Sequence, residues 1–205
     1  MELFVKICGL CRADDVEGVR ALAPDAVGFV FWPPSPRAVR PADVAAWTGD
    51  WPRSILRVGV FVDLPRDEVR DVMRTARLDV AQLHGSETPE FCAGLGRRVW
   101  RAMRLEPDAA EIIRPYDVEA VLLDSGDERR PGGTGRAVDW GKARSFVIDA
   151  DRRVILAGGL TPGNVAAAAR AVRPWGVDVS TGVETAPGRK DLARVKDFIE
   201  TCRSL

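Results

Sequence analysis

Eight apolar runs rich in β-branched and aromatic residues recur along the 205-residue chain and alternate with stretches of helical period. Many of these runs are apolar on both faces, as strands buried inside a parallel sheet are. Regular strand and helix alternation implies parallel strands joined by right-handed crossovers. The expected strands are residues 3–7, 26–31, 55–62, 78–83, 98–103, 119–123, 153–157 and 176–180.

Eight such units in a chain of this length favour a closed (β/α)8 barrel, the TIM-barrel form of the α/β class. An open doubly wound sheet is the alternative. No long linker or shift of composition divides the chain, so we expect residues 1–205 to form one barrel domain. The longest irregular stretch, residues 124–137, is long enough to serve as a functional loop.

Composition and charge exclude several classes of partner. Thirty basic residues balance thirty acidic ones, so the chain lacks the electrostatic footprint of a nucleic-acid-binding protein. No apolar run approaches the length of a membrane span, and the first residues show no signal-peptide pattern. Four scattered cysteines do not form the framework of a disulfide-rich secreted domain. We therefore expect a cytoplasmic protein with reduced thiols and no nucleic-acid or membrane partner.

A Cys-x-x-Cys pair, Cys8 and Cys11, stands between the first expected strand and the first helical stretch. This placement is typical of a thiol redox site and supplies half of the ligands of a zinc site. The alternative is that the two cysteines are unrelated. In that case Cys8 belongs to a different kind of active site.

The carboxyl ends of barrel strands converge on one face, so the residues that close the strands are candidates for chemistry. Asp124 is either a general acid or a cap or ion-pair partner. Cys8, beside Lys6, is either a packing residue or a thiolate base. His84, the single histidine, has no accompanying ligand set, so we expect no metal site.

Two loops at this end of the predicted barrel together indicate an anion site. Gly158 and Gly159 follow the seventh strand, and Ser180, Thr181 and Gly182 follow the eighth. Small residues let backbone N–H groups approach an anion, so the pair of loops predicts a phosphate cradle rather than two empty turns.

A stiff, proline-rich loop carries a third candidate, Arg37. Its guanidinium suits bidentate recognition of a carboxylate or phosphate. The competing interpretation is an ordinary solvated loop arginine.

Short motifs follow one another over nearly the whole chain: VKICG at 5–9, AVGFVF at 26–31, SPR at 35–37, VGVFV at 58–62, QLHG at 82–85, LLD at 122–124, GGTG at 132–135, DW at 139–140, LAGGL at 156–160, VDVSTGVE at 177–184 and PGRKD at 187–191. Together they make the chain resemble the phosphoribosylanthranilate isomerase family of tryptophan biosynthesis. The resemblance implies a (β/α)8 barrel that uses no metal or organic cofactor. It also implies an aldose–ketose isomerase acting on a phosphosugar that carries an anthranilate group.

Within that family, the reaction is an Amadori rearrangement of N-(5′-phosphoribosyl)anthranilate to 1-(2-carboxyphenylamino)-1-deoxyribulose 5-phosphate, the third pathway-specific step from chorismate to tryptophan. The resemblance implies that Asp124 is the general acid, that Cys8 is the general base and that Arg37 meets the anthranilate carboxylate. The remaining residues that we assign to substrate binding are His84, Gly133, Gly135, Gly158, Gly159, Asp178, Ser180, Thr181 and Gly182.

Three residues depart from the family pattern: Cys11 stands where threonine is usual, Asp63 where asparagine is usual and Thr181 where serine is usual. Asp63 adds a negative charge near an anionic substrate. Cys11 places a second thiol near Cys8, and oxidation to a disulfide would remove the proposed base.

Three rival functions share parts of this pattern. A thiol–disulfide oxidoreductase would use Cys8 and Cys11, but such folds mix parallel and antiparallel strands. Another phosphosugar isomerase or epimerase, or a non-catalytic phosphosugar-binding barrel, would keep the phosphate cradle. We favour the isomerase acting as a monomer, with a homodimer as the alternative.

Overall fold

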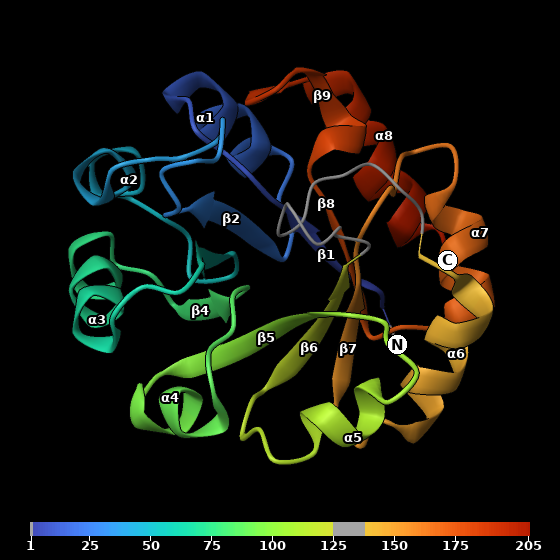
Figure 1. Cartoon of the computed structure of the whole chain (residues 1–205). Coiled ribbons are helices and arrows are strands. Elements are labelled where there is room, and N and C mark those ends of the chain that lie inside the picture. The colour runs from blue at the N-terminus through green and yellow to red at the C-terminus, as the bar shows by residue number, and fades with distance from the viewer. Residues whose placement is uncertain (1, 125–137) are drawn as a thin grey trace.

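The computed structural model describes residues 2–124 and 138–205. Its eight strands form a closed barrel in the order β1 to β8, and each pairs in parallel with its neighbours. The helices lie around the outside of this ring of strands (Figure 1). The predicted (β/α)8 barrel is therefore confirmed. The strands are β1 (Phe4–Ile7), β2 (Ala26–Val30), β3 (Leu56–Phe61), β4 (Val80–Leu83), β5 (Arg98–Arg104), β6 (Ala120–Asp124), β7 (Arg153–Leu156) and β8 (Gly176–Val179).

A helix follows each strand of the barrel: α1 (Ala13–Ala21), α2 (Pro41–Trp47), α3 (Arg66–Thr75), α4 (Pro89–Gly94), α5 (Ala109–Ile113), α6 (Trp140–Asp149), α7 (Val165–Val172) and α8 (Leu192–Arg203). Between β8 and α8 the chain adds a short 3-10 turn, η1 (Thr181–Val183), and an antiparallel hairpin of β9 (Glu184–Ala186) and β10 (Arg189–Lys190). The sequence pattern did not predict this hairpin, because its strands are too short to show a period of two.

Side chains alternate along each strand between the inside of the barrel and the surrounding helices. The outward set packs against the helices as the larger core cluster. The inward set forms a second, mainly aliphatic cluster, closed at the amino end of the strands by Phe4, which stacks on Trp175 and meets Trp100 edge-on. The buried members of this inner cluster are Ala26, Val58, Val80, Trp100, Ala102, Ala120, Leu122, Ile155 and Ala157.

The barrel interior becomes polar toward the carboxyl ends of the strands. Lys6, Gln82 and Asp178 are buried polar residues. The residues two positions before Lys6 and Gln82, Phe4 and Val80, belong to the apolar inner cluster. Buried polar groups need partners, so this change of character marks the end of the barrel at which specific contacts replace simple packing.

No helix within residues 2–124 and 138–205 is both long enough and apolar enough to cross a membrane.

Two isoleucines provide a matched test of the inner cluster. Ile155 is fully buried within the barrel, whereas Ile148 on α6 is 65% exposed. Ile155→Ala should lower the free energy of unfolding by about 2–5 kcal/mol, because it removes buried methyl groups from a closed interior. Ile148→Ala should change it by about 0.5 kcal/mol or less. Urea unfolding of the two variants checks this, and equal losses would contradict the two-sided core.

Candidate active site

A buried ion pair joins the first and last strands of the barrel. Lys6 and Asp178 are direct partners in the β1–β8 register, and Lys6 Nζ lies 2.9 Å from Asp178 Oδ1. Cys8 lies two residues after Lys6, just beyond the end of β1, and therefore faces the same side of the barrel as Lys6. On β2, Gly28 makes room for both, because a Cβ there would lie 2.6 Å from Cys8 Sγ and 3.1 Å from Lys6 Nζ.

The ion pair determines the charges around Cys8. Burial alone would lower the pKa of Lys6, but Asp178 and Cys8 raise it above its ordinary value, so Lys6 is an ammonium. Burial raises the pKa of the Cys8 thiol, while Lys6 pulls it back down. Cys8 is therefore mainly a thiol near neutral pH, and any thiolate it forms is stabilised by the adjacent ammonium. Asp178, which we assigned to substrate binding, here holds Lys6.

Asp124 and His84 meet at the same end of the barrel. Asp124 is the last residue of β6 and is buried, and its Oδ2 lies 3.5 Å from Nε2 of His84, which follows β4. Burial, together with the positive charges of Lys6 and Arg101, lowers the pKa of His84 to about 4. His84 is consequently a neutral imidazole at pH 7.

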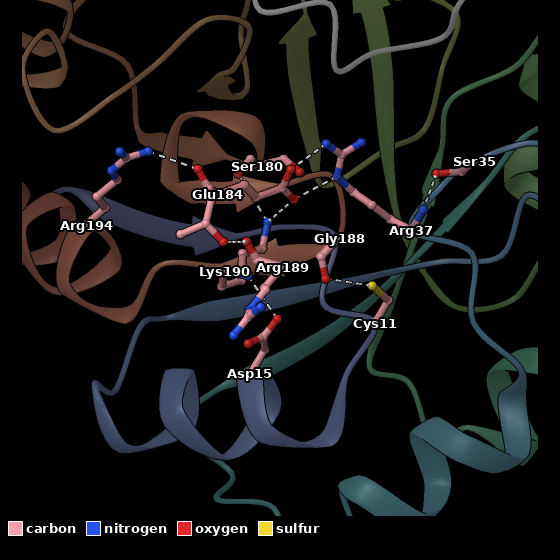
Figure 2. A network of polar contacts seen from close by, with 11 residues as sticks. Cys11, Asp15, Ser35, Arg37, Ser180, Glu184, Gly188, Arg189, Lys190 and Arg194 are labelled. Carbon is pink, nitrogen blue, oxygen red and sulfur yellow. Dashed lines mark hydrogen bonds and ion pairs between the residues drawn. The ribbon is translucent and has the colours of Figure 1, made fainter.

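Arg37 is held by an acidic partner and is not a solvated loop arginine. Its Nε and Nη2 donate to Glu184 Oε1 and Oε2 at 2.8 and 2.6 Å, and its side chain is only 12% exposed (Figure 2). Lys190 Nζ donates to the same carboxylate at 2.8 Å. Sequence reasoning missed Glu184 and Lys190, because nothing in the local pattern links them to a residue so distant in the chain.

The two glycine loops pack directly on each other. Gly158 and Gly159 adopt left-handed backbone conformations (φ 80° and 67°) after β7. A Cβ on Gly182, after β8, would collide with the Leu160 carbonyl oxygen, so only glycine permits this approach. Asn164 fixes the first loop, accepting from Thr161 N–H at 2.8 Å and donating to the Gly159 carbonyl at 2.9 Å. The sequence analysis did not single out Asn164.

The residues predicted for the loops after β7 and β8 therefore lie together in the described part of the chain. Ser180 and Thr181 lie between β8 and Gly182, on the loop that contacts the β7 loop. Gly133 and Gly135 lie outside the described residues.

The departures at positions 11 and 63 have separate local partners. Cys11 Sγ donates to the Gly188 carbonyl at 3.1 Å, in the turn of the β9–β10 hairpin. Asp63 has a left-handed backbone (φ 51°), and its Oδ1 accepts from Ser86 N–H and Oγ–H at 2.6 and 2.8 Å. Asp63 therefore stabilises the loop that follows His84. Both Cys8 and Cys11 are free thiols.

No group of three or more His, Cys, Asp or Glu side chains in the described part of the chain is arranged to hold a metal ion. The groups gathered at the carboxyl ends of the strands are instead one carboxyl, one thiol, a neutral imidazole, an arginine held by a carboxylate and two interlocked glycine loops. A (β/α)8 barrel with groups of these kinds at the carboxyl ends of its strands is typical of the enzymes of this fold, many of which bind phosphorylated small molecules there.

Comparison with known proteins is more specific. The family model described as N-(5'phosphoribosyl)anthranilate (PRA) isomerase matches residues 5–201, so the chain belongs to this family. A relative of that name from Geobacter sulfurreducens is 45% identical over 200 residues, covering 97% of this chain and 98% of the relative.

Solved structures agree with this assignment. Phosphoribosyl anthranilate isomerase from Thermus thermophilus superposes with a TM-score of 0.87 at 38% identity, covering 98% of this chain and 99% of that one. A phosphoribosyl anthranilate isomerase in complex with reduced 1-(o-carboxyphenylamino)-1-deoxyribulose 5-phosphate superposes with a TM-score of 0.86 at 34% identity, covering 99% and 100% of the two chains. The similarity therefore extends over the whole fold in both comparisons.

The single histidine makes the state of His84 directly measurable. A pKa lowered to about 4 means that His84 stays neutral in the folded protein while the unfolded chain takes up a proton below about pH 6.5. Its imidazole NMR signals should therefore not shift between pH 7.5 and 5.5. The His84 contribution to stability should fall as the pH drops from about 6.5 toward 4. A titration midpoint near 6.5 in the folded protein would contradict the buried, neutral imidazole.

Proposed function

We propose that the chain catalyses the Amadori rearrangement of N-(5′-phosphoribosyl)anthranilate to 1-(2-carboxyphenylamino)-1-deoxyribulose 5-phosphate. Membership of the isomerase family over residues 5–201 is the observation that carries this proposal. The arrangement of the site supports it, because Asp124 and Cys8 occupy the same end of the barrel on β6 and just after β1. A general acid and a general base are the two groups that this rearrangement needs.

In the first step, the Asp124 carboxyl gives its proton to the furanose ring oxygen. The nitrogen lone pair forms the C1′=N bond as the C1′–O bond breaks, and the product is an open-chain Schiff base. His84 lies beside Asp124 as a neutral imidazole, so it adds no positive charge next to the carboxyl group in this step.

In the second step, the Cys8 thiolate removes the proton from C2′. The electron pair of the C2′–H bond moves into a C1′–C2′ double bond and neutralises the Schiff-base nitrogen, giving an enolamine that tautomerises to the ketone. Lys6, beside Cys8 and held by Asp178, stabilises the thiolate form that this step requires. Both proton transfers use side chains of this chain.

Two anionic ends of the substrate match the two anion-binding regions. The phosphate fits the β7 and β8 loops, where Gly158, Gly159 and Gly182 have no side chain to keep an anion away from the backbone N–H groups. The anthranilate carboxylate fits the guanidinium of Arg37. A relative that binds a ligand with both groups, reduced 1-(o-carboxyphenylamino)-1-deoxyribulose 5-phosphate, supports this assignment. Binding at both ends would hold C1′ and C2′ between the acid and the base.

We further propose that the enzyme is one barrel domain that acts as a monomer in the cytoplasm. The described acid, base and anion-binding candidates all lie at one end of the same barrel, which supports a site carried by one chain. The four free cysteines support a reducing compartment, because the role given to Cys8 requires a reduced sulfur.

Purified protein should consume N-(5′-phosphoribosyl)anthranilate without added metal or nucleotide. The expected readout is loss of the anthranilate fluorescence of the substrate as the rearranged product forms. Folded protein with no turnover would contradict the proposed function.

Removal of the acid or the base should affect chemistry more than binding. Asp124→Asn and Cys8→Ser should each lower kcat by about 10²–10⁴-fold, the usual contribution of a general acid or base, with little change in ligand affinity. Matched controls are Asp117→Asn, an exposed residue before β6, and Cys92→Ser, a buried cysteine on α4. Near-normal kcat in Asp124→Asn and Cys8→Ser would show that the assigned roles are wrong.

A further inference from the structure

The proposed mechanism gives no role to Glu184, yet among residues 2–124 and 138–205 it is the side chain that accepts hydrogen bonds from the Arg37 guanidinium. We propose that Glu184 is a positioning residue, which fixes Arg37 so that one edge of its guanidinium faces the carboxylate of the substrate. On this account Glu184 sets the preference of the site for a carboxylated aromatic amine. The inference rests on the proposed function, because that function supplies the carboxylate.

The geometry of the Arg37–Glu184 pair determines which N–H donors of Arg37 remain available to a ligand. A guanidinium has five N–H donors in a rigid plane. Glu184 takes the edge formed by Nε and Nη2, with distances of 2.8 and 2.6 Å. Within residues 2–124 and 138–205, none of the hydrogen bonds uses Nη1. The edge formed by Nη1 and Nη2 is therefore the one available to a second carboxylate.

Glu184 is itself held from several directions, as Figure 2 shows. Lys190 Nζ donates to Glu184 Oε1 at 2.8 Å and to the Ser180 carbonyl at 3.1 Å. The Lys190 backbone N–H donates to Asp15 Oδ2 at 2.9 Å, and Arg194 Nη1 donates to the Glu184 carbonyl at 2.9 Å. The hairpin thus holds the Glu184 carboxylate through Lys190, α8 holds the Glu184 backbone, and α1 holds the backbone of Lys190. Lys190 also links it to the loop proposed to bind phosphate.

The Arg37 side chain lies over the end of β1 only because position 9 is glycine. Gly9 has a left-handed backbone (φ 78°), and a Cβ there would lie 2.5 Å from Arg37 Cδ and 2.8 Å from Ser180 Oγ. The aliphatic part of Arg37 is therefore confined on one side by Gly9, and its charged end is confined by Glu184. A confined guanidinium loses less freedom when it binds a ligand.

Charge balance supports a positioning role. Arg37 and Lys190 carry two positive charges, and Glu184 supplies one negative charge between them. A substrate carboxylate on Arg37 would balance the cluster, whereas an uncharged aniline would leave it positive. Hydrogen bonding to Arg37 and the positive charge of Lys190 lower the pKa of Glu184 despite its burial, so the carboxylate is ionised at neutral pH.

The test compares two ligands in each protein. One is reduced 1-(o-carboxyphenylamino)-1-deoxyribulose 5-phosphate, and the other is the same compound without the carboxyl group. Wild-type protein should bind the carboxylated ligand more tightly. Glu184→Gln should reduce this preference by about tenfold or more, the usual value of a charge-assisted hydrogen bond, with affinity for the second ligand nearly unchanged. Calorimetric titration measures both affinities.

A matched control exists at the opposite end of the barrel. Glu119, just before β6, accepts from Nε and Nη2 of Arg98, both at 2.7 Å, and so forms the same kind of fork. Glu119→Gln should leave the ligand preference unchanged. In an Arg37→Ala background, Glu184→Gln should have no further effect on the preference, because Glu184 acts through Arg37.

Each outcome decides a different question. Absence of carboxylate preference in the wild type would contradict the proposed function itself. An unchanged preference in Glu184→Gln, an equal weakening of both ligands, or tighter binding of the carboxylated ligand would overturn the inference alone. The last result would make Glu184 a competitor of the substrate. If Glu184→Gln does not fold, Glu184→Asp replaces it. This variant should lose part of the preference for the carboxylated ligand, since the aspartate side chain is one methylene group shorter.

Discussion

The buried contact between Lys6 and Asp178 links the architecture of this barrel to its proposed chemistry. It joins β1 to β8, where the barrel closes, and it places an ammonium beside Cys8. Buried ion pairs add little net stability compared with apolar side chains, because both charges lose their hydration. The contribution of this pair is therefore to hold Lys6 in place and to keep its positive charge beside Cys8. Gly28 belongs to the same unit, since it leaves the space that Lys6 and Cys8 occupy.

The barrel interior is apolar at one end of its axis and polar at the other, and the rest of the site lies at the polar end. Toward the amino ends of the strands, aromatic and aliphatic side chains such as Phe4 and Trp100 fill the interior. Toward the carboxyl ends, the inward side chains are charged or polar and need partners. His84 illustrates the result: burial and nearby cations keep it neutral beside Asp124. The same end carries the glycine loops, so the proposed acid, base and anion-binding groups share one mouth.

The sequence predicted the barrel and its strands well, because buried parallel strands leave continuous apolar runs. It also predicted the position of Asp124 at the end of β6, since a residue that closes a strand lies at the carboxyl end. It did not predict that Arg37 pairs with Glu184, or that Asp178 holds Lys6. These pairs join residues far apart in the chain, and only the closed register of the barrel and the β9–β10 hairpin bring them together. Family resemblance supplied the roles of Cys8 and Asp124, which the residues alone left open.

The proposed mechanism requires that the carboxyl end of the barrel binds a phosphosugar between Cys8 and Asp124. A crystal structure with reduced 1-(o-carboxyphenylamino)-1-deoxyribulose 5-phosphate bound tests it most directly. The phosphate should lie against the loops that carry Gly159 and Gly182, and the carboxylate should meet the Nη1 edge of Arg37. The sugar carbons should then lie between Cys8 and Asp124. A ligand bound elsewhere, or one whose C1′ and C2′ contact neither Cys8 nor Asp124, would contradict the account.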